Sequence, residues 1–192
     1  MKAAAVILAA GASSRFGRPK QLLEIDGETL VSRACRIAIE AACSPVIVVL
    51  GAHADEIRRR GLPAGVRTVF NERHAEGMGH SLARGVAGLD SDAVVILLAD
   101  QPSVDPAILR TMTEELNKPG ISIVWCAQGG IPGPPVMFAR RHFEELAELR
   151  SDEGGRSVVM RHPDAVAVIE VPTTRWDIDD EATWEEFIAD AE

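Results

Sequence analysis

The sequence lacks the residues that would place it in several common classes. It has three cysteines, an odd number without a Cys-x-x-Cys pair, which argues against a disulfide framework or a zinc site and fits a reducing cytoplasm. No apolar run approaches the ~20 residues that a membrane span needs. Basic residues are fewer than acidic ones, 20 against 29, and this balance argues against a nucleic-acid partner. We therefore expect a cytoplasmic protein with one domain over residues 1–192.

Several catalytic motifs are missing as well. No Gly-x-Ser-x-Gly elbow supports a hydrolase triad. Gly77 and Gly79 nearly match a dinucleotide-binding turn, but Leu82 stands where the third glycine should be, so an NAD-dependent dehydrogenase is kept only as an alternative. Histidines without the spacing of metal ligands are expected to be surface or capping residues. The chain has five of these: His53, His74, His80, His142 and His162.

What the sequence does have is an alternation of apolar runs and amphipathic segments. Continuous apolar runs at 3–9, 45–51 and 93–100 are typical of parallel strands buried on both faces. We expect further strands at 67–70, 121–127, 135–138 and 166–171, and helices at 29–42, 54–60, 79–89, 105–117, 140–149, 154–161 and 181–190. The alternation predicts an α/β fold, Rossmann-like, with a mostly parallel sheet flanked by helices. Residues 128–135, rich in glycine and proline, are expected to form a loop.

Three cations follow the first strand in the stretch LAAGASSRFGRPK. Arg15, Arg18 and Lys20 stand there with two glycines, and no acidic residue precedes Glu24. In an open α/β sheet, ligands bind beyond the carboxyl ends of the strands. Glycines let backbone amides approach a ligand, and a guanidinium and an ammonium together can hold phosphate oxygens. Although no Walker Gly-Lys-Ser/Thr follows, we interpret the stretch as a triphosphate cradle rather than a solvated basic turn.

Carboxylates follow two other strands. Asp100 comes after seven apolar residues, and a carboxylate at such a place is unfavourable unless it is paired or binds a cation. Beside phosphates Mg²⁺ is the natural partner, because it takes one or two carboxylates plus substrate oxygens. The stretch WDIDD offers the second carboxylate, and alternation puts Asp177 and Asp179 on one face if the segment is extended. The plainer alternatives are a turn cap at Asp100 and an acidic surface in residues 177–192.

Together these motifs resemble a known family. LAAGASSRFGRPKQLLEIDG, NERHAEGMGHSLARGV, ILLADQPSV, GIPGPPVMF, SDEGGRS and WDIDD, in this order, are similar to GT-A-type nucleotidyltransferases that act on the molybdenum cofactor, the MocA and MobA type. The resemblance implies Mg²⁺-dependent transfer of a nucleotidyl group to a phosphate, with release of pyrophosphate. It implies catalytic roles for Arg15, Lys20 and Asp100, and metal binding by Asp100, Asp177 and Asp179. The nucleotide would lie against Leu8, Ala9, Ala10, Gly11, Gly77, Met78 and Ser81.

The resemblance also bears on the nucleotide and the acceptor. Guanylyltransferase relatives usually carry LAGG where this chain has LAAG, so Ala10 favours CTP over GTP and the cytidylyltransferase branch. The implied acceptor is a molybdopterin-type phosphate. The family's usual Gly-His-Pro is Gly133-Pro134-Pro135 here, which leaves a sugar or polyol phosphate open as the acceptor. The implied protein partner is a molybdoenzyme or its chaperone. A catalytically idle nucleotide-binding or chaperone-like module that delivers cofactor to an oxidoreductase also stays open.

Overall fold

The three long apolar runs form the centre of the sheet, as the sequence predicts. In the computed structural model, which describes residues 1–171, 178 and 180–191, β1 (Ala3–Ala9) lies between β4 (Val46–Leu50) and β6 (Ala93–Leu98). Strand β1 pairs with both neighbours in parallel, and every residue of β1 and β4 is buried. Because such strands have no solvent face, their apolar residues follow one another without alternation.

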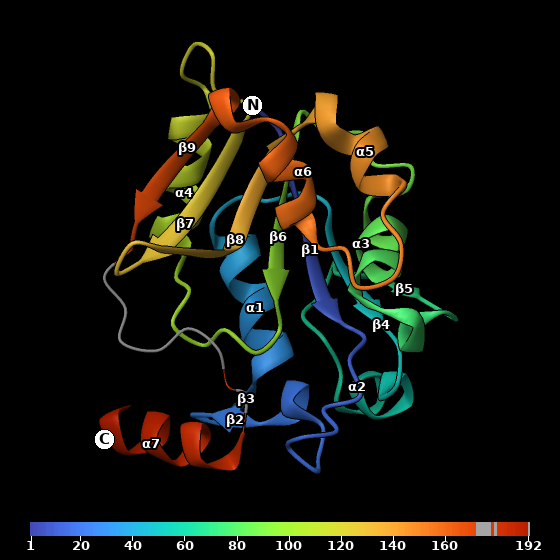
Figure 1. Ribbon diagram of the computed structural model, residues 1–192. Helices are drawn as coiled ribbons and strands as arrows, with labels where there is room; N and C mark the ends of the chain where they lie inside the picture. The colour runs from blue at the N-terminus through green and yellow to red at the C-terminus, as the bar shows by residue number, and fades with distance from the viewer. Residues whose placement is uncertain (172–177, 179, 192) are drawn as a thin grey trace.

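Seven strands form one sheet in the order β5-β4-β1-β6-β8-β7-β9 (Figure 1). The remaining members are β5 (Arg67–Phe70), β7 (Ile123–Gln128), β8 (Ile131–Ala139) and β9 (Val166–Glu170). Strand β8 runs antiparallel to both of its neighbours, and the other pairs in this sheet are parallel. The predicted α/β class with a mostly parallel sheet is therefore confirmed.

Residues 128–135 do not form a loop, so that prediction is wrong. Strand β7 turns at Gly129 and Gly130, whose φ angles are 56° and 77°, and the chain returns as β8. A two-residue turn with positive φ at both positions suits the twist of a hairpin, and glycine adopts it without strain. The prolines of β8 are tolerated because β6 pairs only with residues 136–139, so the proline stretch has a partner strand on one side alone.

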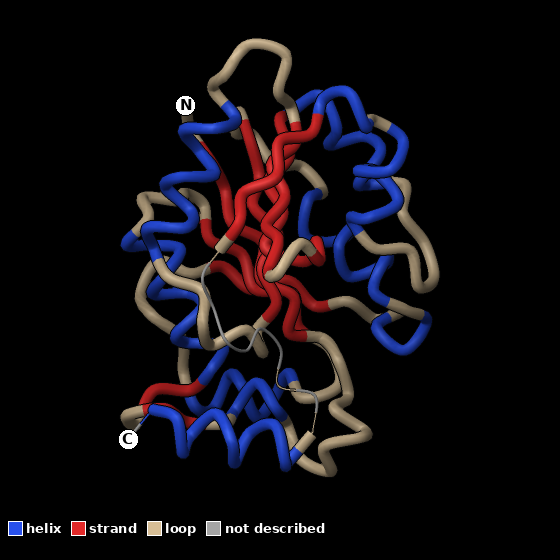
Figure 2. Tube along the Cα trace, turned by 60° about the vertical axis from the view of Figure 1, so that its left-hand side comes forward, coloured by secondary structure: helices blue, strands red, loops and turns tan. Residues whose placement is uncertain are grey.

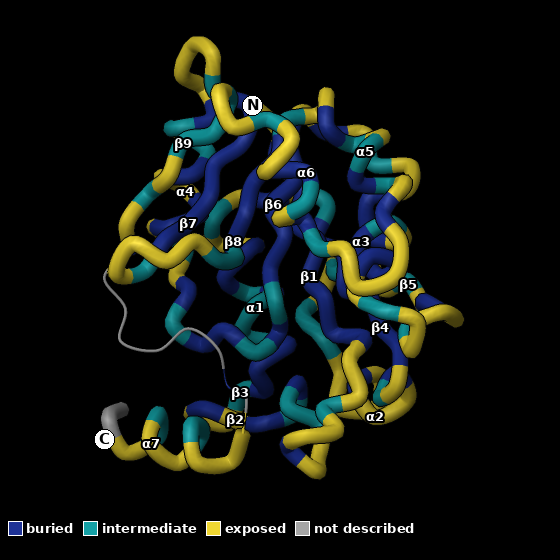
Figure 3. The backbone as a smooth tube through the Cα atoms, viewed as in Figure 1, coloured by how far each residue is buried: buried dark blue, intermediate teal, exposed yellow. Residues whose placement is uncertain are grey.

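Helices cover both faces of the sheet (Figure 2). One face carries α1 (Leu30–Glu40), α2 (Ala54–Arg60) and α4 (Pro106–Leu116), and the other carries α3 (Met78–Val86), α5 (Phe143–Ala147) and α6 (Gly155–Arg161). Alternate residues of β1 point into the two cores, Ile7 into the first and Val6 into the second. The buried layers run along the sheet under these helices (Figure 3). None of the helices in the described part of the chain is long and apolar enough to cross a bilayer.

Side chains at the helix starts explain where α1 and α4 begin. Asp105 accepts a hydrogen bond from the Ile108 N–H at 2.9 Å, and Pro106 occupies the first position of α4, as the sequence predicts. Thr29 caps α1 by accepting from the Ser32 N–H at 3.3 Å. The structure therefore differs from the predicted helix over 29–42. Thr29 ends a short strand and caps the helix, and α1 begins at the next residue, Leu30.

Residues 20–29 form a small substructure for which the sequence holds no clear pattern. The 3-10 helix η1 (Lys20–Leu22) leads into β2 (Glu24–Ile25) and β3 (Glu28–Thr29), an antiparallel pair that turns at Asp26 and Gly27. Helix α7 (Glu181–Ala191) lies against this substructure (Figure 1). The contact is apolar and is made by Phe16, Leu23, Ile25, Leu30, Ile178, Trp184, Phe187 and Ile188. The last helix thereby supports the segment that follows the opening loop.

Candidate functional site

A cavity of about 520 Å³ opens at the carboxyl ends of β1 and β6. Its walls come from the segment after β1, the segment before and within α3, the end of β6, and the loop before α6. The lining residues are Leu8, Ala10, Gly11, Ala12, Ser13, Ser14, Arg15, Phe16, Lys20, Gln21, His74, Ala75, Gly77, Met78, Ser81, Leu98, Ala99, Asp100 and Asp152. The cavity lies where an open α/β sheet is expected to bind its ligand, and it brings together site residues that are far apart in the sequence.

Ala9 is the one predicted nucleotide-site residue that does not line this cavity. Its side chain is 1% exposed and packs in the core beneath α1 and α4. Successive side chains of a strand point to opposite faces, so Leu8 and Ala10 face the cavity side and Ala9 does not. The side chain of Ala9 therefore belongs to the packing of the fold. Two predicted metal ligands, Asp177 and Asp179, lie outside the described residues.

Local hydrogen bonds give the opening loop its shape. The Ser13 carbonyl accepts from the N–H groups of Phe16 and Gly17 at 3.0 and 3.1 Å, and the Ser13 hydroxyl accepts from the Lys20 N–H at 3.1 Å. Gln21, only 5% exposed, donates from Nε2 to the Gly11 carbonyl at 2.9 Å and accepts from Ser13 Oγ at 3.3 Å. Gln21 is not predicted as a site residue, because its position directly after the cationic stretch is its only signal in the sequence.

Lys20 and Asp100 meet at the floor of the site. Lys20 Nζ lies 2.7 Å from Asp100 Oδ2 and donates to the Ile178 carbonyl at 2.6 Å, and the two side chains are 13% and 23% exposed. The Ile178 N–H donates to the Asp100 carbonyl at 3.1 Å. Ile178 stands between the two aspartates predicted as metal ligands, so this residue of the WDIDD stretch does reach the end of β6. A cation and a carboxylate predicted to hold a triphosphate and its metal are thus direct neighbours.

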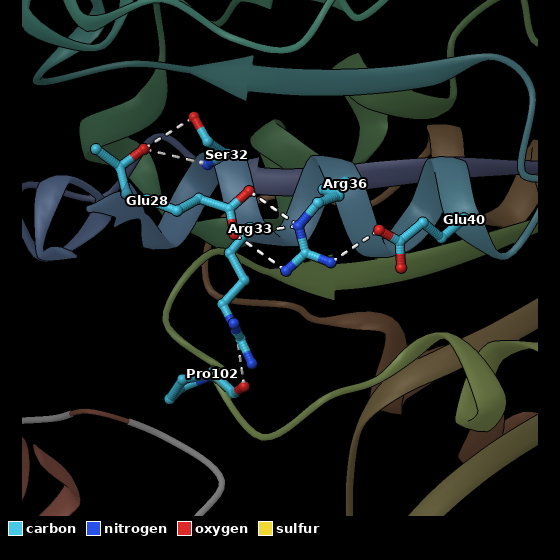
Figure 4. A network of polar contacts seen from close by, with 7 residues as sticks. Glu28, Ser32, Arg33, Arg36, Glu40 and Pro102 are labelled. Carbon is cyan, nitrogen blue, oxygen red and sulfur yellow. Dashed lines mark hydrogen bonds and ion pairs between the residues drawn. The ribbon is translucent and has the colours of Figure 1, made fainter. Parts of the chain in front are cut away.

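Helix α1 anchors the loop that follows Asp100 (Figure 4). Arg33 Nε donates to the Pro102 carbonyl at 3.2 Å. One turn further along, Arg36 binds Glu28 of β3 and Glu40 with contacts of 2.9 to 3.2 Å, and these bonds raise the pKa of the guanidinium. The same helix therefore holds both the β2–β3 hairpin and the chain beyond Asp100.

The opposite wall of the cavity depends on close backbone contact at Gly77 and Gly79. Gly77 has φ of +119°, and a Cβ there would overlap the backbone of Ser151. The Gly79 N–H donates to the Ser151 carbonyl at 2.8 Å, and a Cβ at Gly79 would collide with the backbone of Arg150. These glycines therefore let the start of α3 lie directly against the loop that contributes Asp152 to the cavity.

Ser81 is oriented by a buried neighbour. Asn71 Nδ2 donates to Ser81 Oγ at 2.9 Å, and both residues are buried. Because the serine oxygen accepts this bond, its own hydroxyl proton remains to be donated elsewhere. Asn71 also accepts from the Arg73 N–H at 3.0 Å, which fixes its amide. Asn71 is a second site residue that sequence reasoning missed.

Two charged residues, Arg18 and Asp180, contact the start of α7. Asp180 accepts from the Thr183 N–H at 2.9 Å and from its hydroxyl at 2.6 Å. These bonds, followed by the charges of Arg15 and Lys20, lower the pKa of the Asp180 carboxyl. Arg18 donates to Glu181 at 2.6 Å and lies over the Phe16 ring. Arg18, one of the three cations of the opening loop, is thus engaged with α7, and Asp180 acts as a helix cap.

Comparison with known proteins decides the family. Residues 5–166 match the family described as the MobA-like NTP transferase domain. The chain belongs to this family. The match begins in β1 and ends at the start of β9, so it includes the described walls of the cavity up to Asp152. The class of fold and the class of enzyme, a nucleotidyltransferase, are therefore those that the motifs indicate.

Relatives within the family carry different names. The chain is 31% identical to nicotine blue oxidoreductase of Paenarthrobacter nicotinovorans over 94% of its length and 89% of that protein. It is 30% identical to the purine catabolism protein PucB of Bacillus subtilis, with 95% and 92% covered. It is 26% identical to molybdenum cofactor cytidylyltransferase of Escherichia coli, with 70% and 69% covered.

A solved structure shares the whole architecture. The crystal structure of Rv0371c from Mycobacterium tuberculosis superposes with a TM-score of 0.84 at 31% identity, covering 98% of both chains. A second structure of Rv0371c, in complex with manganese, has a TM-score of 0.81 at 28% identity, with 98% of this chain and 99% of that one covered. The arrangement of sheet, helices and α7 is therefore that of a known fold.

Proposed function

We propose that the cavity binds a nucleoside triphosphate with Mg²⁺ and that the chain transfers the nucleotidyl group to a phosphorylated acceptor. The observation that carries the proposal is the juxtaposition of Lys20 Nζ and Asp100 Oδ2, 2.7 Å apart, beneath a glycine-containing loop that also presents Arg15 to the cavity. A cation for phosphate and an oxygen ligand for a hard metal ion are the two groups that this chemistry needs side by side.

The donor set fits magnesium. Mg²⁺ prefers oxygen ligands and usually keeps several waters beside one or two carboxylates and substrate phosphates. The Asp100 carboxylate is 23% exposed at the cavity, so it can reach such an ion without leaving its loop. Asp177 or Asp179 would supply a second carboxylate. An ion held there would supply positive charge beside the phosphates. The manganese complex of Rv0371c supports a divalent ion in a protein of this fold.

The chain's own residues would position and stabilise rather than act as a base. Lys20 and Arg15 hold the β- and γ-phosphates and balance the charge that develops on the departing pyrophosphate. An oxygen of the acceptor phosphate attacks the α-phosphorus in line, a new P–O–P bond forms, and the bond between the α-phosphorus and the bridging oxygen breaks. Since the attacking phosphate is already ionised at neutral pH, no side chain has to remove its proton.

Nucleotide preference follows from the end of β1. Ala10 is 5% exposed and lines the cavity, so its methyl group takes space that a purine would need. The Ser81 hydroxyl, which has a proton to donate, faces the same cavity. Either O2 of cytosine or O6 of guanine could accept this proton, so the choice between the two bases rests on the space beside Ala10. We therefore propose CTP as the preferred nucleotide over GTP.

For the acceptor we propose the phosphate of a molybdopterin-type cofactor, in the cytoplasm, with a molybdoenzyme or its chaperone receiving the product. The named activity of the Escherichia coli relative supports this choice. A sugar phosphate or polyol phosphate remains the alternative acceptor within the same chemistry. The alternative without catalysis is a module that binds the nucleotide and transfers no nucleotidyl group.

A panel of nucleotides and acceptors tests the proposal. CTP and GTP are each incubated with Mg²⁺ and with molybdenum cofactor or a polyol phosphate, and pyrophosphate release is measured. We expect release with CTP and molybdenum cofactor, and a loss of Mg²⁺-dependent release in Asp100→Asn. Release with the polyol phosphate alone would replace the acceptor. Nucleotide binding without release from any pair would favour the non-catalytic module.

A further inference from the structure

A second cluster of metal-ligating side chains lies at the opposite end of the sheet. His142 ends η3 (Arg140–His142), Glu145 lies in α5, and His162 follows α6. Ser122, which contacts His142, precedes β7. Strands β7 and β9 start at this end, whereas the nucleotide cavity lies where β1 and β6 finish (Figure 1). The cluster is therefore separate from Lys20 and Asp100.

We propose that His142, Glu145 and His162 form a binding site for a first-row transition-metal ion of the Zn²⁺ type. One ligand atom of each side chain lies within 4.8 Å of those of the other two. His142 Nδ1 is 3.4 Å, and His162 Nε2 is 2.7 Å, from Glu145 Oε1. Two imidazoles and one carboxylate are ligands that zinc takes when it keeps one position open to water.

Two of the three distances between ligand atoms can be compared with what the ion needs, and the third, between the two histidines, is at most 4.8 Å. Metal–ligand bonds of about 2.0–2.1 Å in a tetrahedron put neighbouring ligand atoms about 3.4 Å apart. The His142–Glu145 distance already has this value. The His162–Glu145 distance has to open by about 0.7 Å when the ion replaces the hydrogen bond between them. The side chains of His162 and Glu145 are 35% and 31% exposed, so they can make this adjustment and admit a water ligand.

Surrounding groups orient the ligands as outer-shell partners do in metal sites. His142 Nε2 lies 2.9 Å from Ser122 Oγ, and a proton donated from Nε2 to that oxygen leaves the Nδ1 lone pair facing Glu145. Arg161 Nε donates to Glu145 Oε2 at 2.9 Å, which leaves Oε1 to the two histidines.

The site would join α5 to the chain beyond α6. Both segments belong to the side of the sheet that also carries α3, and the loop between α5 and α6 supplies Asp152 to the nucleotide cavity. The donor set distinguishes this site from the proposed catalytic one, because imidazole nitrogen suits zinc and Mg²⁺ prefers oxygen. The inference rests on this cluster alone and does not depend on the proposed function.

Metal binding can be measured directly on the purified chain. After treatment with a chelator, the protein is titrated with Zn²⁺ by calorimetry in a buffer that holds millimolar Mg²⁺. We expect one ion per chain, and at least a tenfold weaker affinity in Glu145→Gln and in His162→Asn. Co²⁺ used in place of Zn²⁺ should give the visible absorption of a tetrahedral site in the unmodified protein and not in these variants.

His53→Asn is the matched control. His53 Nδ1 is 3.3 Å from Glu56 Oε1, so it offers a histidine–carboxylate pair without a third ligand among the described residues. This variant should bind Zn²⁺ as the unmodified protein does. Circular dichroism checks that Glu145→Gln and His162→Asn are folded. The proposal is overturned if the unmodified protein takes up no stoichiometric Zn²⁺, or if folded Glu145→Gln and His162→Asn bind it undiminished.

Discussion

Lys20 illustrates at the residue scale how one side chain can be tested for a role in turnover. Its ammonium touches Asp100 and the Ile178 carbonyl at the cavity floor. Lys20→Ala should lower kcat by about 10²–10³, because one lost transition-state contact of this electrostatic kind costs about 3–4 kcal/mol. Lys118→Ala is the control, since it also removes a lysine–carboxylate pair, with Glu115 at 2.6 Å, but on an exposed helix end. Equal turnover of the two variants would contradict the assignment.

Ala10 tests the basis of nucleotide choice. Its methyl group lines the cavity, and one methyl in an apolar pocket changes discrimination by about 1–3 kcal/mol. The unmodified chain should prefer CTP over GTP by roughly 10- to 200-fold in kcat/KM, and Ala10→Gly should reduce this ratio. Ala9→Gly removes the same group one residue earlier, on the other face of β1, and should leave the ratio unchanged. A ratio that falls equally in both variants would show that the preference has another source.

Residue roles could be predicted where the chemistry of the side chain determines them. Lys20 and Asp100 are predictable because a cation and a carboxylate follow buried strands, and the structure puts them together. Gln21 and Asn71 could not be found in this way, because a neutral amide becomes important only through the carbonyl or hydroxyl that it contacts in space. The pairing of His142 with His162, twenty residues apart in sequence, is likewise invisible to spacing rules.

At the scale of elements, the start of α3 depends on Gly77. Gly77→Ala should destabilise the fold and weaken nucleotide binding, because the added Cβ overlaps Ser151 and φ is +119°. Gly88→Ala is the matched control, since Gly88 also has positive φ, +71°, but has no atom near its Cβ position. The control should lose about 1–2 kcal/mol of unfolding free energy from backbone strain alone. Urea unfolding that gives the same loss in both variants would contradict the close-contact role of Gly77.

Elements were predictable where a regular pattern extends over their whole length. The buried strands β1, β4 and β6 have uninterrupted apolar residues, and α4 has both a cap and a proline at its start. Strand β8 was not predicted in full, because proline and glycine usually mark loops and its tolerance of them depends on having only one partner strand there. The β2–β3 hairpin could not be predicted, because strands of two residues are too short to show a periodic pattern.

The three buried cysteines make the stability of the whole molecule depend on pH. Burial raises the pKa of Cys35, Cys43 and Cys126 from 9.0 to about 12, 11 and 12, and the charge of Glu28 adds to the effect at Cys35. Above pH 9 the unfolded chain loses thiol protons that the native chain keeps, so stability should fall as pH rises from about 9 towards 11–12. Below that range these groups have no such effect.

Thiol labelling and unfolding check this expectation. Near neutral pH a thiol reagent should react with the native chain only as fast as the chain unfolds, and with all three cysteines in urea. The urea midpoint should be lower at pH 10 than at pH 8. Rapid labelling of a cysteine in the native protein, or a midpoint that does not fall at pH 10, would show that the thiols are less protected than the structure indicates.

For the whole molecule, the central proposal is that one cavity, at one edge of the sheet, transfers a nucleotidyl group. The most direct measurement follows the α-phosphate itself, with CTP labelled at the α-phosphorus and molybdenum cofactor as acceptor in the presence of Mg²⁺. We expect the label to appear in the acceptor, unlabelled pyrophosphate to be released in equal amount, and Lys20→Ala to slow both. Label that stays in CTP, with no pyrophosphate released, is the result that overturns this claim.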